Sequence, residues 1–235
     1  MYFPMFYDPT YFLVLIGVVL SLLAQAKVNN TFARYSRVSN DRGMTGAEAA
    51  RRILQGAGVN DVRVERIAGN LTDHYDPRTK VLRLSDSVYG QASVAAIGVA
   101  AHECGHAIQH ARGYAPLKIR SLLVPVANFG AQIAWPLIVF GLFLTTKTSA
   151  LLINIGIIAF LGSVLFQLVT LPVEYNASNR AIQIIGESGI LYGDELRGAR
   201  KVLSAAALTY VASAATAILQ LLRIVLLVGG RRRND

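Results

Sequence analysis

The chemically most informative stretch of the chain is HECGH, residues 102–106, inside the apolar run VAAIGVAAHECGHAIQH. Residues four apart on a helix share a face, so His102 and His106 can direct their imidazole nitrogens at one ion. Catalytic zinc takes three protein ligands and leaves one position for water. Glu103, beside the first histidine, can accept the proton of that water as it attacks a carbonyl carbon. The pattern predicts zinc-dependent hydrolysis, and it requires a third ligand.

A chance pairing of histidines is the alternative, because three fixed residues in five also occur in unrelated chains. Glu103 argues against it. Its carboxylate would lie in the middle of an otherwise apolar helix, where a buried charge is costly unless a positive partner lies beside it. Zinc is the simplest such partner.

Three residues are candidates for the third ligand. His110 shares the face of His102, but eight helical residues place it about 12 Å away, too far for one ion. His74 lies near the expected hairpin, and a lone histidine of a strand is more often an ordinary polar residue. Glu174 follows an apolar segment that Pro172 is expected to end, so it could be a ligand or an acid at a helix N-terminus. The residues alone leave this choice open.

The composition indicates an integral membrane protein. Of 235 residues, 53% are hydrophobic and 16% charged, and the mean hydropathy is +0.43. Three segments are long and apolar enough to cross a bilayer, namely 11–26, 121–144 and 151–173. A fourth, 202–230, contains Arg223 and can either cross the membrane or lie along it.

The charge pattern predicts the orientation. Between Lys27 and Arg120 there are 14 Lys or Arg residues, whereas the loop between the second and third segments has only Lys147. The positive-inside rule therefore places the long basic segment in the cytoplasm and the N-terminus outside. The net charge of +9 is spread along the chain, which favours contact with anionic lipid and not with nucleic acid.

The region before HECGH predicts a small α+β domain. Thr45 and Glu48 form a capping box for a helix over 46–55, and Ser85 can cap a short helix. Strands are expected over 62–67 and 80–84 with a turn at 76–79, so a β-hairpin precedes the HECGH helix, which is expected to end near Ala111.

We also expect the second strand to offer an edge for an extended substrate, through Lys80, Val81, Leu82, Arg83 and Leu84. Oxyanion stabilisation could come from Arg180, Tyr175 or His110.

AAHECGHAIQH, followed after two apolar segments by VEYNASNRA, resembles the YugP-type family of membrane-bound neutral zinc metallopeptidases. The resemblance covers nearly the whole chain, including HYDPRTKVLRLS and the basic C-terminal end. A more distant similarity is to HtpX and the CAAX prenyl protease, whose second motif has Glu, three residues and then Asp. The resemblance implies that Glu174 is the third zinc ligand and that the protein is an endopeptidase of the bacterial cytoplasmic membrane. Ser178 stands where the distant relatives have Asp, so it can hydrogen-bond but carries no charge.

The expected fold is mainly α and integral to the membrane, with three to four transmembrane helices and a zincin-like catalytic domain. Five parts are expected: an anchor (11–26), a cytoplasmic catalytic part (27–120), a transmembrane hairpin (121–173), a second catalytic part with the third ligand (174–201) and a C-terminal membrane helix (202–230). The predicted function is hydrolysis of protein or peptide substrates at or near the bilayer with one Zn²⁺ per chain and the active site facing the cytoplasm.

Two other function classes fit the sequence less well. A catalytically silent membrane scaffold with a structural zinc site would need a fourth protein ligand to close the coordination sphere. The nearest sulfur, Cys104, points to another helix face. A structural site would also give Glu103 no role. A proton-coupled transporter is disfavoured because the second and third apolar segments contain no acidic or basic residue. Cys104 is also the single cysteine, so no intramolecular disulfide can form.

Overall fold

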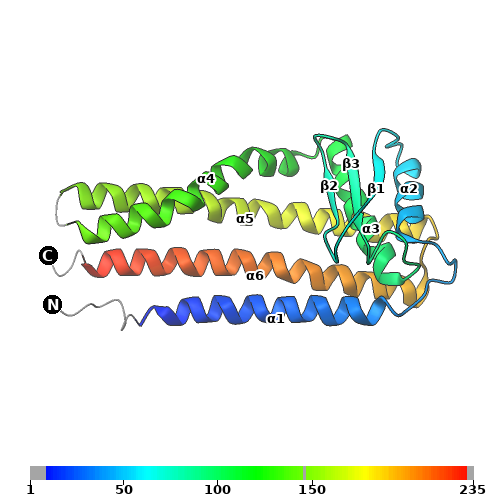
Figure 1. Ribbon diagram of the computed structural model, residues 1–235, viewed down its shortest axis with the longest axis horizontal. Helices are drawn as coiled ribbons and strands as arrows, with labels where there is room; N and C mark the ends of the chain where they lie inside the picture. The colour runs from blue at the N-terminus through cyan, green and yellow to red at the C-terminus, as the bar shows by residue number, and fades with distance from the viewer. Residues whose placement is uncertain (1–8, 145–146, 232–235) are drawn as a thin grey trace. The chain divides into compact units, whose positions relative to one another are not determined.

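The structure is a computed structural model that describes residues 9–144 and 147–231. These ranges contain six helices and three strands: α1 (Tyr11–Tyr35), α2 (Gly46–Gly56), β1 (Arg63–Ile67), β2 (His74–Asp76), β3 (Val81–Ser85), α3 (Val94–Ala111), α4 (Ala115–Phe143), α5 (Lys147–Glu187) and α6 (Gly193–Arg231) (Figure 1).

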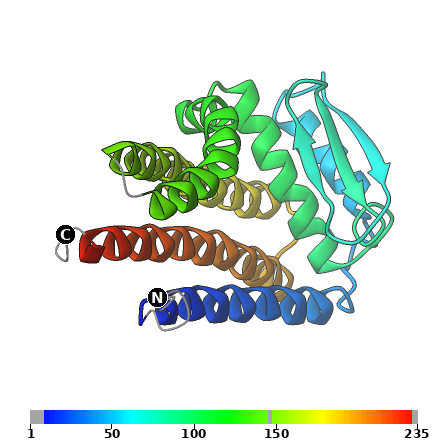
Figure 2. The same ribbon diagram turned by 60° about the vertical axis from the view of Figure 1, so that its left-hand side comes forward.

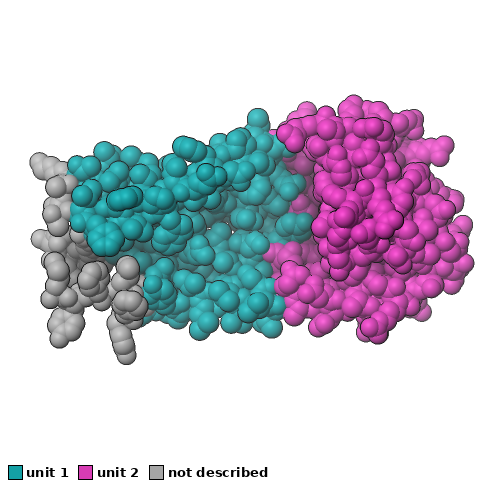
Figure 3. Space-filling view, in the orientation of Figure 1, with its two compact units in different colours: residues 1–23, 119–171, 210–235 teal, residues 24–118, 172–209 magenta. Residues whose placement is uncertain are grey.

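The chain divides into two compact units, coloured separately in Figure 3. Unit 1 comprises Met1–Leu23, Ile119–Leu171 and Tyr210–Asp235, and unit 2 comprises Ala24–Lys118 and Pro172–Thr209. The helices α1, α4, α5 and α6 contribute residues to both units.

Unit 1 consists of helical segments suited to a bilayer. By length and composition, α1, α4, α5 and α6 can each cross a membrane, and only 17–22% of their most apolar windows is buried. Gly130 on α4 lies so close to α5 that an added Cβ would be 2.5 Å from the Ala159 carbonyl oxygen. Small residues allow membrane helices to pack in this way. The expected class, a mainly helical membrane protein, is confirmed.

In unit 2, α2 begins with the predicted capping box. The Thr45 side chain accepts from the Glu48 N–H at 3.3 Å, and the Glu48 carboxylate accepts from the Thr45 N–H at 2.8 Å. Ile53 and Leu54 on the buried side of α2 join the core around α3. The helices α2 and α3 pack on each other and against the sheet (Figure 2).

The sheet has the order β1-β3-β2, with β1 parallel and β2 antiparallel to β3. The hairpin before α3 is thus formed by β3 and the unpredicted three-residue strand β2, while β1 joins β3 from the other side. Gly69 and Leu71, with φ of +112° and +56°, lie where the chain reverses between β1 and β2.

This topology corrects the predicted substrate edge. The strand β3 is central, and its residues Val81–Ser85 pair with β1 while Val81–Arg83 also pair with β2. The predicted edge at Lys80, Val81, Leu82, Arg83 and Leu84 is therefore wrong, because backbone groups of β3 are already used on both sides.

Helix boundaries differ from the prediction at three places. The helix α1 continues to Tyr35, beyond the predicted end of the anchor at Ala26. The predicted short helix after Ser85 is only a turn, in which the Val88 and Tyr89 N–H groups donate to the Ser85 carbonyl. The helix α5 continues through Pro172, because membrane helices tolerate the loss of the one backbone hydrogen bond that proline removes. Glu174 is consequently mid-helix, which excludes its alternative role as an N-terminal acid.

Candidate metal centre

The candidate centre lies wholly in unit 2, where α3 packs on the part of α5 that follows Pro172. The N-cap Ser93 starts α3 by accepting a hydrogen bond from the Ala96 N–H at 3.2 Å. Gly105, the fourth residue of the motif, lies against the backbone of α5, and an added Cβ would be 2.6 Å from the Ala177 carbonyl oxygen. The glycine therefore permits the close approach that carries both histidines to α5.

Three side chains converge at this contact. The Glu174 Oε2 atom lies 3.2 Å from His102 Nε2 and 3.3 Å from His106 Nε2. All three candidate ligand atoms lie within 4.8 Å of one another. The side chains are 12% exposed for each histidine and 3% for Glu174, so the cluster is largely shielded from water.

The donor set suits zinc. Two imidazole nitrogens and a carboxylate oxygen are the ligands of the His₂Glu type of catalytic zinc site. Both Nε2 atoms face the same oxygen, which brings acceptor lone pairs together in a nearly buried place. A cation, metal ion or proton is required to stabilise such an arrangement. His102, His106 and Glu174 can therefore hold a divalent metal.

Without metal, the surroundings of His106 favour the protonated form of its imidazole. Burial alone would lower the pKa of His106, but its hydrogen bond to Glu174 and the negative charges of Glu103 and Glu174 outweigh burial. The pKa of His106 is consequently raised above its ordinary value. Metal binding therefore competes with protonation of His106, because histidine ligates as the neutral imidazole.

Glu103 is the remaining acidic residue of the motif. Its side chain lies on α3 with the residue only 9% exposed, and it has no hydrogen bond or ion pair with any residue in the described ranges. Its charge nevertheless acts on the neighbouring His106 and Cys104. A nearly buried carboxylate without a partner is available to accept a proton next to the candidate ligands.

Each histidine has a partner on its second ring nitrogen. His102 Nδ1 lies 3.1 Å from the Ser178 hydroxyl, and His106 Nδ1 lies 3.0 Å from the Gln109 side-chain oxygen. Ser178 was a sequence candidate, whereas Gln109 was not. Its position three residues after His106 on the same helix was the one signal that could have found it.

The other two histidines lie outside this cluster. His110 is exposed, and its Nδ1 lies 2.8 Å from the Tyr75 hydroxyl. His74 on β2 contacts the Thr72 carbonyl at 2.9 Å and the Arg83 guanidinium at 3.4 Å. Among the residues that the structure describes, the ligand cluster contains neither of them.

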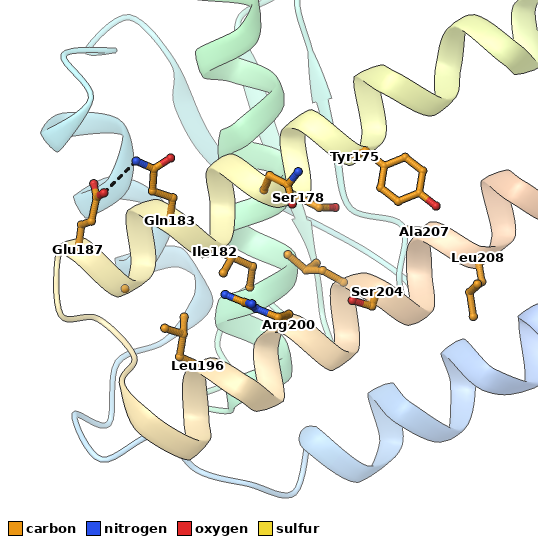
Figure 4. Close-up of a pocket in the computed structure, with 13 residues that line it drawn as sticks. Tyr175, Ser178, Ile182, Gln183, Glu187, Leu196, Arg200, Ser204, Ala207 and Leu208 are labelled. Atoms are coloured by element: carbon orange, nitrogen blue, oxygen red, sulfur yellow. Dashed lines mark hydrogen bonds between the residues drawn. The ribbon is translucent and has the colours of Figure 1, made fainter.

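Arg180 and Tyr175, the other proposed oxyanion donors, have different surroundings. Arg180 donates to the Asn176 side-chain oxygen at 2.7 Å, and its guanidinium lies over the Tyr114 ring at 5.8 Å. Tyr175 is 44% exposed and lines a groove of about 800 Å³ between α5 and α6 (Figure 4). Ser178 also lines this groove, so it lies between the groove and His102.

Cys104 does not belong to the cluster. Its buried thiol lies 3.6 Å from the Ala50 carbonyl oxygen of α2, and burial raises the pKa of the thiol well above its ordinary value. The thiol therefore packs between α2 and α3 as a neutral group.

Comparison with known proteins agrees with a metal-binding cluster in a membrane protein. The chain is 50% identical over 224 residues to "Putative membrane protease YugP" of Bacillus subtilis (strain 168), covering 95% of this chain and 98% of the relative. No solved structure gives a significant match. Residues 10–229 match the family described as "Putative neutral zinc metallopeptidase". With its four apolar helices and its cluster of two histidines and one glutamate, the chain belongs to this family of membrane zinc metallopeptidases.

Proposed function

We propose that the protein is a zinc-dependent endopeptidase that binds one Zn²⁺ through His102, His106 and Glu174. The observation that carries this proposal is the convergence of three candidate ligand atoms within 4.8 Å, beside the nearly buried carboxylate of Glu103, which has no hydrogen bond or ion pair among the described residues. Bound zinc supplies a Lewis acid that polarises a carbonyl group and lowers the pKa of water.

Glu103 is the proposed general base and acid. It accepts a proton from the attacking water and then delivers that proton to the leaving amine. Its low exposure keeps bulk water from competing for the proton. Arg180, Tyr175 and His110 are the proposed candidates for stabilising the oxyanion.

The proposed location is the bacterial cytoplasmic membrane, with unit 2 in the cytoplasm. The 14 Lys or Arg residues from Lys27 to Arg120 support this orientation, because basic segments stay on the cytoplasmic side. In this arrangement 11–26 is an anchor, 121–173 is a transmembrane hairpin, and 27–120 and 174–201 together form the catalytic part. The proposed substrates are proteins or peptides in or near the membrane.

Substitution Glu103→Gln tests the proposal. The amide keeps the size of the side chain but cannot accept the proton, so we expect peptide hydrolysis to fall by at least about 100-fold. Bound zinc, measured by elemental analysis of detergent-purified protein, should stay near the wild-type value. Wild-type rates of cleavage in the variant would refute the role of Glu103.

A further inference from the structure

Gln109 connects α3 to α5 directly behind His106. It is 0% exposed, and its Nε2 donates to the Val173 carbonyl at 2.8 Å and to the Asn176 side-chain oxygen at 3.0 Å. Its Oε1 faces His106 Nδ1 at 3.0 Å. Three polar contacts therefore surround one buried amide.

Two independent contacts determine which way this amide points. The Val173 carbonyl can only accept, so the Gln109 group that faces it must be the NH₂. Arg180 can only donate, so its 2.7 Å contact makes Asn176 present its oxygen, and Gln109 again has to present its NH₂. Both contacts leave the Gln109 oxygen facing His106.

The orientation of the amide determines the form of the imidazole. Because the Gln109 oxygen can only accept, His106 Nδ1 must carry a hydrogen. In the neutral ring the lone pair is then on Nε2, the atom that lies 3.3 Å from Glu174 Oε2. We propose that Gln109 is a positioning residue that holds neutral His106 in the Nδ1–H tautomer, ready to ligate metal through Nε2. This inference rests on the proposed metal site.

His102 provides the contrast. Its Nδ1 lies 3.1 Å from the Ser178 hydroxyl, which can donate or accept. Ser178 therefore does not select a tautomer of His102. Of the two candidate histidine ligands, His106 faces a group that can only accept a hydrogen bond, whereas His102 faces one that can donate or accept. The partner therefore fixes the position of the lone pair in His106 but not in His102.

A simpler role for Gln109 is to hold α3 on α5 by hydrogen bonds, with no effect on the imidazole. The two roles predict different results. An inter-helix contact affects stability with and without metal alike, whereas a tautomer-selecting acceptor affects the affinity for zinc. Such partners of metal-bound histidines typically change metal affinity by about 10- to 100-fold.

The first test uses the wild-type protein in detergent with ¹³C,¹⁵N-labelled histidine. The chain has four histidines, and the variants His74→Gln and His110→Gln simplify the assignment of His106. NMR of the metal-free protein, above the pH at which His106 is protonated, should show the Nδ1–H tautomer, and addition of zinc should shift Nε2. An Nε2–H tautomer in the metal-free protein would overturn the proposal whether or not zinc binds. An Nδ1–H tautomer without zinc binding would instead contradict the proposed metal site, so the two failures are distinguishable.

The second test compares zinc affinity by chelator competition. Gln109→Leu removes the acceptor and should weaken binding by about 10- to 100-fold. Gln109→Glu restores an acceptor oxygen and should lose less affinity than Gln109→Leu. The control Ile108→Val alters a fully buried neighbour on α3 and should lower thermal stability with unchanged zinc affinity. Unchanged affinity in Gln109→Leu, or equal losses in the two Gln109 variants, would overturn the proposal.

Discussion

The two histidines of HECGH differ in what supports them. His106 faces a buried amide whose direction is set by α5, whereas His102 faces the hydroxyl of Ser178. An aspartate stands at the latter position in the distant relatives that the sequence resembles. A carboxylate would accept only, and would strengthen the imidazole as a metal ligand.

We expect Ser178→Asp to bind zinc more tightly than wild type and Ser178→Ala to bind it more weakly. The introduced carboxylate holds hydrogen on His102 Nδ1 and leaves Nε2 free, while alanine supplies no partner. Chelator competition on purified protein measures both changes. Tighter binding by Ser178→Ala than by Ser178→Asp would show that this contact does not support the ligand.

Some of these residues could be predicted from the sequence, and others could not. The spacing of His102 and His106 predicts that both share one helix face, and the structure places them so. The resemblance pointed to Glu174, because no local pattern joins residues 72 positions apart. Gln109 was missed because its role depends on a carbonyl and an amide of α5, which the sequence of α3 does not reveal.

At the scale of elements, the contact between α3 and α5 holds the candidate ligands together. Gly105 has no room for a Cβ, which would be 2.6 Å from the Ala177 oxygen and 3.1 Å from the Ala177 Cα. Both are backbone atoms and cannot move without shifting α5. Gly98 lies on α3, as Gly105 does, but a Cβ added there would make only an ordinary van der Waals contact, with Ala199 Cβ at 3.5 Å.

We therefore expect Gly105→Ala to lose most of its bound zinc, because the two helices must separate. Gly98→Ala, the matched control, should keep the wild-type zinc content. Elemental analysis with a thermal melt of each protein makes the comparison. Full zinc binding by Gly105→Ala would show that the helices do not need this close approach.

Elements were predicted well where the signal is local. The capping box at Thr45 and the apolar face of α2 depend on neighbouring residues, and both are present. The parallel pairing of β1 with β3 depends on distant residues, and the three-residue β2 is too short for a pattern. The prediction that Pro172 ends the apolar helix was wrong, because the helix-breaking tendency of proline is weaker where the surrounding helices support the backbone.

At the scale of the whole molecule, the apolar helices and the basic segments together imply an orientation. The four helices can cross by length and composition, and α6 is one helix from Gly193 to Arg231. The basic residues from Lys27 to Arg120 favour a cytoplasmic location for the part that carries HECGH.

This orientation can be tested by cysteine labelling in intact cells. In a Cys104→Ala background, a cysteine at the exposed Thr148, near the start of α5, should react with a membrane-impermeant maleimide. A cysteine at the exposed Arg52 on α2 should react only after the cells are opened. The reverse pattern would place the candidate site outside the cytoplasm.

The central claim is that His102, His106 and Glu174 form a catalytic zinc site, and zinc content tests it most directly. Elemental analysis of detergent-purified wild type, Glu174→Ala and the control Glu187→Ala should be combined with cleavage of an unfolded protein. Glu187 is an exposed acid on the same helix, bonded only to Gln183 among the described residues. We expect about one zinc per chain with cleavage in wild type and in the control, and loss of both in Glu174→Ala. Full zinc content in Glu174→Ala, or no zinc in wild type, would contradict the claim.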